Sequence, residues 1–163
     1  MKKFGITGWK NAGKTSLIER LVAEFVARGL RVSTLKHAHH TFEIDHEGRD
    51  TFRHRSAGAA EVLVSSGTRW ALMSELRGDP EPALDELIAK MTPVDLVLIE
   101  GWKASPHPKL EVWRAETGHP LIAPGDKTIR AVASDASLDL KIPVLDLNNT
   151  MALADFVQSE AGI

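Results

Sequence analysis

Residues 8–15 are Gly8-Trp9-Lys10-Asn11-Ala12-Gly13-Lys14-Thr15, which match the pattern G-x-x-x-x-G-K-[ST] at every fixed position. The two glycines of this pattern let the backbone turn tightly and approach a phosphate, while successive N–H groups point into one concavity. The lysine reaches the β- and γ-phosphates, and the hydroxyl of Thr15 suits a Mg²⁺ ion. The sequence therefore predicts a nucleoside triphosphate site formed by residues 8–15 together with Ser16.

The sequence on either side of this loop has the context that the motif requires. Residues 3–7 read as a short strand, and residues 14–28 read as a helix with Leu17, Leu21 and Phe25 at helical spacing. Gly29 then suits a left-handed helix end. Further strands are expected over 30–36, 94–100, 110–114, 129–133 and 143–147, and further helices over 82–91 and 150–158.

This alternation of strands and helices predicts an α/β fold of the P-loop NTPase type. We expect a three-layer sandwich with a mainly parallel sheet and helices on both faces. Residues 59–76 read as a protruding β-hairpin around Ser65-Ser66-Gly67-Thr68. Residues 1–163 are accordingly expected to form a single nucleotide-binding domain that carries the hairpin as an extension.

The composition excludes several classes of function. The chain has 163 residues and no cysteine, which rules out disulfides, zinc–thiolate sites and a cysteine nucleophile. Its net charge of −2 gives no reason to expect a nucleic-acid partner or a membrane surface. Its apolar runs are shorter than a membrane span, and no signal-peptide stretch is present, so a cytoplasmic location is expected.

Two carboxylates are candidates for holding Mg²⁺ beside Thr15. Glu100 ends the apolar run 94–100, and ligands of nucleotide-binding α/β folds lie at the carboxyl ends of strands. The alternative for Glu100 is a solvated acid at a strand end. Asp45 lies in the polar, histidine-rich stretch 37–57 and is expected to reach the ion or its waters. The predicted metal ligands are therefore Thr15, Glu100 and Asp45.

The histidine-rich stretch has more than one interpretation. In an extended chain, His37 and His39 fall on the same side, as two metal ligands would. The stretch can instead contact phosphate or a second ligand, or be an inert loop, and the role of His40 is equally open. The nearby arginines, Arg49, Arg53 and Arg55, either bind an anion or form a solvated basic face.

Asp135 is the candidate for reading the base. It follows Ser134 at the end of a late strand, where an aspartate can accept hydrogen bonds from N1 and N2 of guanine. Adenine offers no such pair of donors, so this placement favours GTP. The usual Asn-Lys-x-Asp motif is absent, and the alternative is a turn or helix N-cap aspartate.

These stretches together resemble one family, the molybdopterin-guanine dinucleotide biosynthesis adaptor proteins, MobB. The resemblance covers most of the chain and rests on the loop, on Lys36-His37-Ala38-His39-His40 with Phe42, Asp45 and Gly48-Arg49-Asp50, on Arg53-His54-Arg55-Ser56-Ala57-Gly58-Ala59, and on Leu98-Ile99-Glu100-Gly101-Trp102-Lys103. It implies a GTP-binding, weakly hydrolysing protein that assists attachment of GMP to molybdopterin. It also implies a molybdopterin guanylyltransferase as partner, molybdopterin as a possible ligand, and a homodimer in which the hairpin 59–76 crosses to the second copy.

Two other functions fit parts of the sequence. A small-molecule kinase suits the chain length and the early phosphate loop, although no lid with paired arginines is evident. A metallochaperone-type GTPase would use the histidines. No nucleophile and no base for activating water is evident, so the catalytic residues are unassigned and the chain is expected to be at most a slow Mg²⁺-dependent GTPase.

Overall fold

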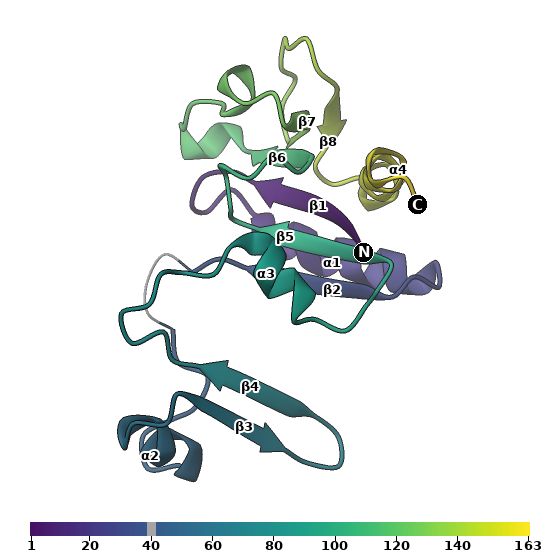
Figure 1. The fold of residues 1–163 in the computed structure, drawn as a ribbon. Helices are drawn as coiled ribbons and strands as arrows, with labels where there is room; N and C mark the ends of the chain where they lie inside the picture. The colour runs from purple at the N-terminus through teal and green to yellow at the C-terminus, as the bar shows by residue number, and fades with distance from the viewer. Residues whose placement is uncertain (39–41) are drawn as a thin grey trace. The chain divides into compact units, whose positions relative to one another are not determined.

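The computed structural model describes residues 1–38 and 42–163 of the chain. These residues form two compact units (Figure 1). The sheet unit contains residues 1–37 and 91–163, and the hairpin unit contains residues 38–90.

The sheet unit is built on six strands in which every neighbouring pair runs parallel. Their spatial order is β2 (Val32–Lys36), β5 (Leu96–Glu100), β1 (Lys2–Thr7), β6 (Lys109–Trp113), β7 (Ile129–Ser134) and β8 (Val144–Asp146). The predicted mainly parallel sheet is thus confirmed. Because β1 lies between β5 and β6, the segments that follow these three strands meet at the same edge of the sheet.

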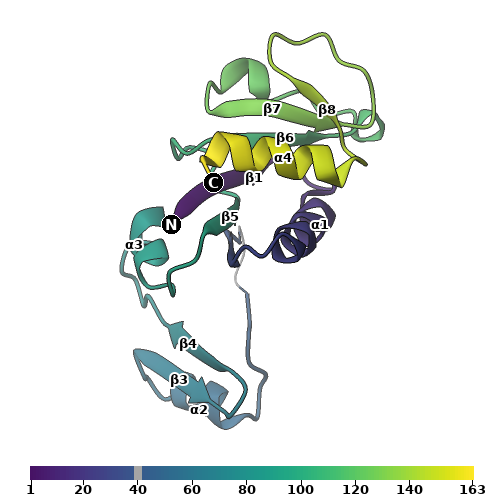
Figure 2. The ribbon, with the colours of Figure 1, turned by 90° about the vertical axis from the view of Figure 1, so that its right-hand side faces the viewer.

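Two α-helices cover one face of this sheet. α1 (Lys14–Ala27) and α4 (Thr150–Ala161) pack against each other and bury the apolar side chains of that face (Figure 2). Leu17, Leu21 and Phe25 of α1 are fully buried with Phe4 of β1, as the helical spacing predicts. α1 ends at the expected place, because Gly29 follows its last turn with φ +82°.

Buried polar side chains mark the opposite face of the sheet. On β6, Lys109 and Glu111 alternate with the core residues of the other face, and both are buried. The amide N–H groups of Ile122 and Ala123 donate to the Glu111 carboxylate at 2.8 Å each. The carboxylate of Glu111 thus helps to fix the segment with the short 3₁₀ helices η1 (Ala115–Thr117) and η2 (Ala123–Gly125) to β6.

The hairpin unit contains the predicted hairpin and an unpredicted helix. β3 (Glu61–Ser65) and β4 (Trp70–Ser74) pair antiparallel, with Leu63 opposite Leu72. The polar stretch 37–57 contains α2 (Asp50–Ser56), which packs against β3. α3 (Leu84–Ala89) is shorter than the helix predicted over 82–91.

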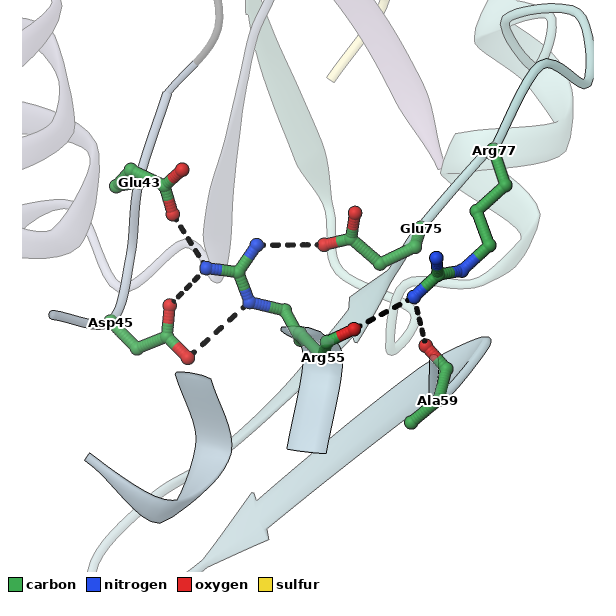
Figure 3. A network of polar contacts seen from close by, with 6 residues as sticks. All are labelled: Glu43, Asp45, Arg55, Ala59, Glu75 and Arg77. Atoms are coloured by element: carbon green, nitrogen blue, oxygen red, sulfur yellow. Dashed lines mark hydrogen bonds and ion pairs between the residues drawn. The ribbon is translucent and has the colours of Figure 1, made fainter. Parts of the chain in front are cut away.

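An ion-pair network around Arg55 of α2 holds the hairpin unit together (Figure 3). Nη2 of Arg55 donates to Glu43 and to Asp45 at 2.6 Å each, and Nη1 donates to Glu75 at 2.8 Å. Arg77 continues the network, because its Nη2 donates to the carbonyl oxygens of Arg55 and Ala59. Three segments that are separate in the sequence are thereby joined at one guanidinium.

Candidate nucleotide-binding site

The loop between β1 and α1 makes turns that its glycines permit. Gly8 has φ +139°, and a Cβ atom there would lie 2.4 Å from the carbonyl oxygen of Val112. Gly13 has φ +96° and forms the N-cap of α1, while Asn11 between them also has a positive φ of 65°. Only glycine fits at residue 8, because the loop crosses the backbone of β6 there. The free amides at the start of α1 form an anion-binding end of the helix.

A hollow of about 410 Å³ lies at this loop, lined by Lys10, Asn11, Gly13, Lys14, Thr15, Ser16 and Glu100. All of these except Glu100 belong to the predicted nucleotide-binding segment, and Glu100 is a predicted metal ligand. The hydroxyl of Thr15 and the carboxylate of Glu100 thus line one hollow, which suits a cation that prefers oxygen ligands. Ala12 does not line it, because its side chain is buried in the core.

Lys14 has a charged environment. Its ammonium donates to the carbonyl oxygen of Trp9 at 2.8 Å. Burial lowers the pKa of Lys14 below its ordinary value, and the nearby cations of Lys103 and Lys36 lower it further, while Glu100 opposes them. The hollow therefore combines an ammonium, neighbouring positive charges and one carboxylate.

Trp9 connects the loop to two other segments of the sheet unit. Its indole N–H donates to the carbonyl oxygen of Pro120 at 2.7 Å, and its ring lies 5.4 Å from that of His119. The ammonium of Lys103 lies 4.7 Å from the centre of the Trp9 ring, a cation–π contact. The side chain of Trp9 thus supports the loop conformation, and Lys103 joins the cations around the site.

Glu100 lies at the carboxyl end of β5, as the sequence predicts, next to the end of β2. Its Oε2 atom lies 3.5 Å from Nζ of Lys36, and its carbonyl oxygen accepts from the amide of His37 at 2.8 Å. Gly101 follows with φ +103°, and a Cβ there would lie 2.6 Å from Cβ of His37. The ring of His37 packs at 4.7 Å from that of Trp102.

His39, the second histidine of the metal-ligand alternative, and His40, whose role is open, lie outside the described residues. Within 1–38 and 42–163, no group of three or more histidine, aspartate or glutamate side chains is placed to hold a metal ion. His37 therefore has an aromatic neighbour in the structure, and the histidine-based metal site stays a prediction.

Asp135 follows β7, as predicted, and its carboxylate contacts the segment after β6. Oδ1 accepts from the amide of Ala115 at 3.2 Å, and Oδ2 lies 3.3 Å from Nη1 of Arg114. Arg114 in turn lies beside the loop, with Nε 3.3 Å from the position that a Cβ on Gly13 would occupy. Arg114 belongs to no sequence motif. The one signal that could identify it as a site residue is its position directly after β6, a strand that neighbours β1.

Asp45, the third predicted metal ligand, belongs to the hairpin unit. Both of its carboxylate oxygens accept from Arg55, and this hydrogen bonding lowers the pKa of Asp45 below its usual value. Arg55, an anion-binding candidate in the sequence, likewise has three carboxylate partners within its own unit. A role for Asp45 at the metal stays a prediction.

These features define a P-loop nucleotide-binding protein. The sheet is parallel, a glycine-rich loop with a lysine ammonium connects β1 to α1, and a carboxylate ends the neighbouring strand β5. Within this class, the family model for molybdopterin guanine dinucleotide synthesis protein B matches residues 4–135. The chain belongs to that family. The matched residues include the loop, Glu100, Arg114 and Asp135.

Relatives of known name agree with this assignment. The chain is 39% identical over 158 residues to the molybdopterin-guanine dinucleotide biosynthesis adapter protein of Haemophilus influenzae, covering 95% of this chain and 86% of the relative. It is 40% identical over 152 residues to the protein of the same name from Escherichia coli, covering 91% and 87%. The family resemblance in the sequence is confirmed.

Solved structures have the same fold. The crystal structure of Bacillus subtilis MobB superposes with a TM-score of 0.77 at 26% identity, covering 99% of this chain and 98% of that one. A MobB homologue from Bacillus stearothermophilus gives a TM-score of 0.73 at 28% identity, covering 99% of both chains. Among the described residues, no helix has the length and apolar character that crossing a membrane requires.

Proposed function

We propose that this chain is a cytoplasmic accessory protein of molybdenum cofactor synthesis that binds GTP with Mg²⁺ and assists attachment of GMP to molybdopterin. Its partner in this role is a molybdopterin guanylyltransferase, with molybdopterin itself as a possible ligand. The observation that carries the proposal is the hollow in which the loop, Lys14, Thr15 and Glu100 come together. The names of the relatives indicate the pathway.

The charges around the hollow support a polyphosphate with a metal ion as ligand. The positive charges of Lys36 and Lys103 act on the ammonium of Lys14, and Glu100 is the carboxylate that opposes them. A bound Mg²⁺ ion would neutralise part of the phosphate charge. Thr15 and Glu100 would hold it, because their side chains line the same hollow and supply oxygen atoms.

Hydrolysis by the isolated protein is proposed to be slow. Of the residues that line the hollow, only Glu100 carries a carboxylate, and the proposal assigns it to the metal. Without a side chain that orients the attacking water, P-loop GTPases turn over far below 1 s⁻¹. The protein is therefore proposed to act by binding GTP within one nucleotide-binding domain and by supporting the transferase.

We propose that the chain acts as a homodimer joined through the hairpin. Leu63, Trp70 and Leu72 lie on the same face of β3 and β4, and each is at least 44% exposed. A two-stranded hairpin with an exposed apolar face is marginal in water by itself. A second copy of the same hairpin offers a matching apolar surface.

Calorimetric titration of GTP with Mg²⁺ tests the nucleotide assignment. Lys14→Ala is expected to weaken binding by about 1.5–3 kcal/mol, the value of a hydrogen bond to a charged group. Lys141→Ala is the matched control, because Lys141 is exposed and lies after β7, away from the loop residues. Equal affinity of Lys14→Ala and the wild-type protein would contradict the assignment, and tight binding of ATP would favour the kinase alternative.

A reconstituted transfer assay tests the role in the pathway. Guanylyltransferase, molybdopterin and limiting GTP are combined with and without the protein. The expected result is a modest rise in guanylylated molybdopterin, which Lys14→Ala fails to produce. No effect at any GTP concentration, or fast multiple-turnover hydrolysis by the protein alone, argues against an accessory role.

A further inference from the structure

The loop is flanked by charged side chains on both sides of β1. On the side of β5 and β2 lie Glu100 and Lys36, which the metal and triphosphate assignments already use. On the side of β6 and β7 lie Arg114 and Asp135, which form an ion pair at 3.3 Å. The proposed function gives no role to Arg114, and the only role predicted for Asp135 is to read guanine.

Arg114 lies against the last glycine of the loop. From the position that a Cβ on Gly13 would occupy, Nε is 3.3 Å away, Nη2 is 3.6 Å away and Cζ is 3.9 Å away. Gly13 is the N-cap of α1, where the amides that bind phosphate gather. The guanidinium therefore lies within a few ångströms of the part of the loop that surrounds a phosphate group.

Asp135 fixes the direction of this guanidinium. Its Oδ2 atom accepts from Nη1 of Arg114, and its Oδ1 atom accepts from the amide of Ala115, the next residue in the chain. A carboxylate bound at both oxygens has little freedom to rotate. The contact with Asp135 uses Nη1, while Nε and Nη2 are the atoms nearest to Gly13.

We propose that Arg114 is a second phosphate-binding cation of this site and that Asp135 is the positioning residue that holds it. The proposal rests on the proposed function, since it requires a nucleotide in the loop. A guanidinium presents N–H groups in one plane, which suits two oxygens of a phosphate chain. Because Arg114 lies against the loop itself, on the flank opposite Glu100, we expect it to contribute to the binding of GTP, GDP and pyrophosphate alike.

The first experiment compares ligands with and without a base. Calorimetric titrations with GTP, GDP and inorganic pyrophosphate are carried out on the wild-type protein, Arg114→Gln and Arg114→Lys. Arg114→Gln is expected to bind all three ligands roughly tenfold to a hundredfold more weakly, and Arg114→Lys to recover part of the loss by keeping the charge. Arg130→Gln is the matched control, because Arg130 is an exposed arginine of β7 paired with Glu160.

The second experiment separates the two possible roles of Asp135. As a positioning residue, Asp135→Asn weakens pyrophosphate binding as well as GTP binding, and adds little when combined with Arg114→Gln. As a reader of guanine alone, Asp135→Asn weakens GTP binding and leaves pyrophosphate binding unchanged. This second result overturns the positioning role.

The outcomes distinguish this inference from the proposed function. If Lys14→Ala loses affinity while Arg114→Gln and Arg114→Lys keep that of the wild-type protein, the inference is wrong and the nucleotide site stands. If the wild-type protein binds neither GTP nor pyrophosphate, the proposed function fails, and this inference fails with it. Thermal unfolding of each variant confirms that altered binding arises in a folded protein.

Discussion

The ammonium nitrogen of Lys14 lies 2.8 Å from the carbonyl oxygen of Trp9, to which it donates a hydrogen bond. A phosphate in the hollow competes with this carbonyl for the same donor. Trp9 is itself held by the carbonyl of Pro120 and by the ammonium of Lys103. In the proposed function, nucleotide binding therefore exchanges one internal hydrogen bond of the loop for a bond to the ligand.

The affinity for GDP is expected to fall with rising pH, and to do so at a lower pH than it would if Lys14 had the ordinary pKa of a lysine. Burial lowers the pKa of Lys14 from 10.5, and only the protonated ammonium attracts phosphate. Affinity is thus highest below the lowered pKa and is lost as the pH rises through it. Titrations between about pH 7 and pH 10 measure this pH dependence of the affinity. It should persist in Lys141→Ala and disappear in Lys14→Ala. An equal slope in both variants would assign the titration to another group.

Gly8→Ala is expected to disrupt the loop. A methyl group at this position meets the carbonyl oxygen of Val112 at 2.4 Å, so the loop must move away from β6. Gly29→Ala is the matched control, because Gly29 also has a positive φ but has nothing within 4 Å of its Cβ position. The control should lose only about 1–2 kcal/mol of unfolding free energy. Gly8→Ala should lose more and should also lose GTP affinity, as urea unfolding and calorimetry will measure.

Glu111→Gln is expected to remove a pH dependence of stability. Burial raises the pKa of Glu111 above its ordinary value of 4.5, although the amides of Ile122 and Ala123 oppose the change. The folded protein therefore binds this proton more tightly than the unfolded chain. Its contribution to stability declines as the pH rises from about 4.5 through the raised pKa. The unfolding free energies of the wild-type protein and Glu111→Gln are measured across this pH range, and their difference should change with pH. A difference that stays constant would show that Glu111 does not titrate in this range.

Glu111→Ala tests the structural role of the same side chain. It leaves two partly buried amides without their acceptor, and each such amide costs up to about 1–3 kcal/mol. The segment 119–123 then loses two of its hydrogen bonds to β6, which weakens the support of Trp9 by Pro120. We expect lower stability together with weaker GTP binding, whereas a loss of stability alone would show that the segment does not support the loop.

Arg55→Leu is expected to loosen the hairpin unit. The substitution leaves Glu43, Asp45 and Glu75 close together without the cation that pairs them. Hydrogen exchange measured by mass spectrometry should increase over residues 42–47 and stay unchanged in the sheet unit. Arg53→Leu is the matched control on the same helix, because its ion pair with Asp50 is exposed and 3.9 Å long. Similar exchange in the two variants would contradict a structural role for the network.

Trp70→Glu is expected to give a monomer if the hairpin joins two copies. Trp70 is 62% exposed on the apolar face of β4, and a carboxylate there opposes burial against a second hairpin. Light scattering at micromolar concentration measures the mass. Met151→Glu is the control, since Met151 is similarly exposed but lies on α4. A wild-type protein that is already monomeric would refute the proposed dimer.

The sequence predicted the sheet unit well because its signals are local. The apolar run 94–100 is typical of a strand buried on both faces, and β5 occupies most of it. Glu100 and Asp135 were assigned from their places after strands, and both lie at the carboxyl ends of β5 and β7. The loop has a motif of its own, and its glycines adopt the positive φ angles that the motif requires.

The features that were missed depend on contacts between distant residues. α2 has a polar sequence, and it is stabilised by bonds from Arg55 to Glu43, Asp45 and Glu75, which no local pattern reveals. Arg114 gains its place beside Gly13 from the order of the strands. The ion pair of Asp45 with Arg55 was likewise not foreseen from the sequence, while the expected role of Asp45 at the metal stays a prediction.

The short outer strand β8 affects how copies of this chain can associate. It has three residues and, within the described part of the chain, pairs with β7 alone, so little free backbone is available there to a strand from another molecule. Short edge strands are one means by which proteins avoid growing into aggregates by strand addition. This end of the sheet thus resists open-ended polymerisation by strand addition.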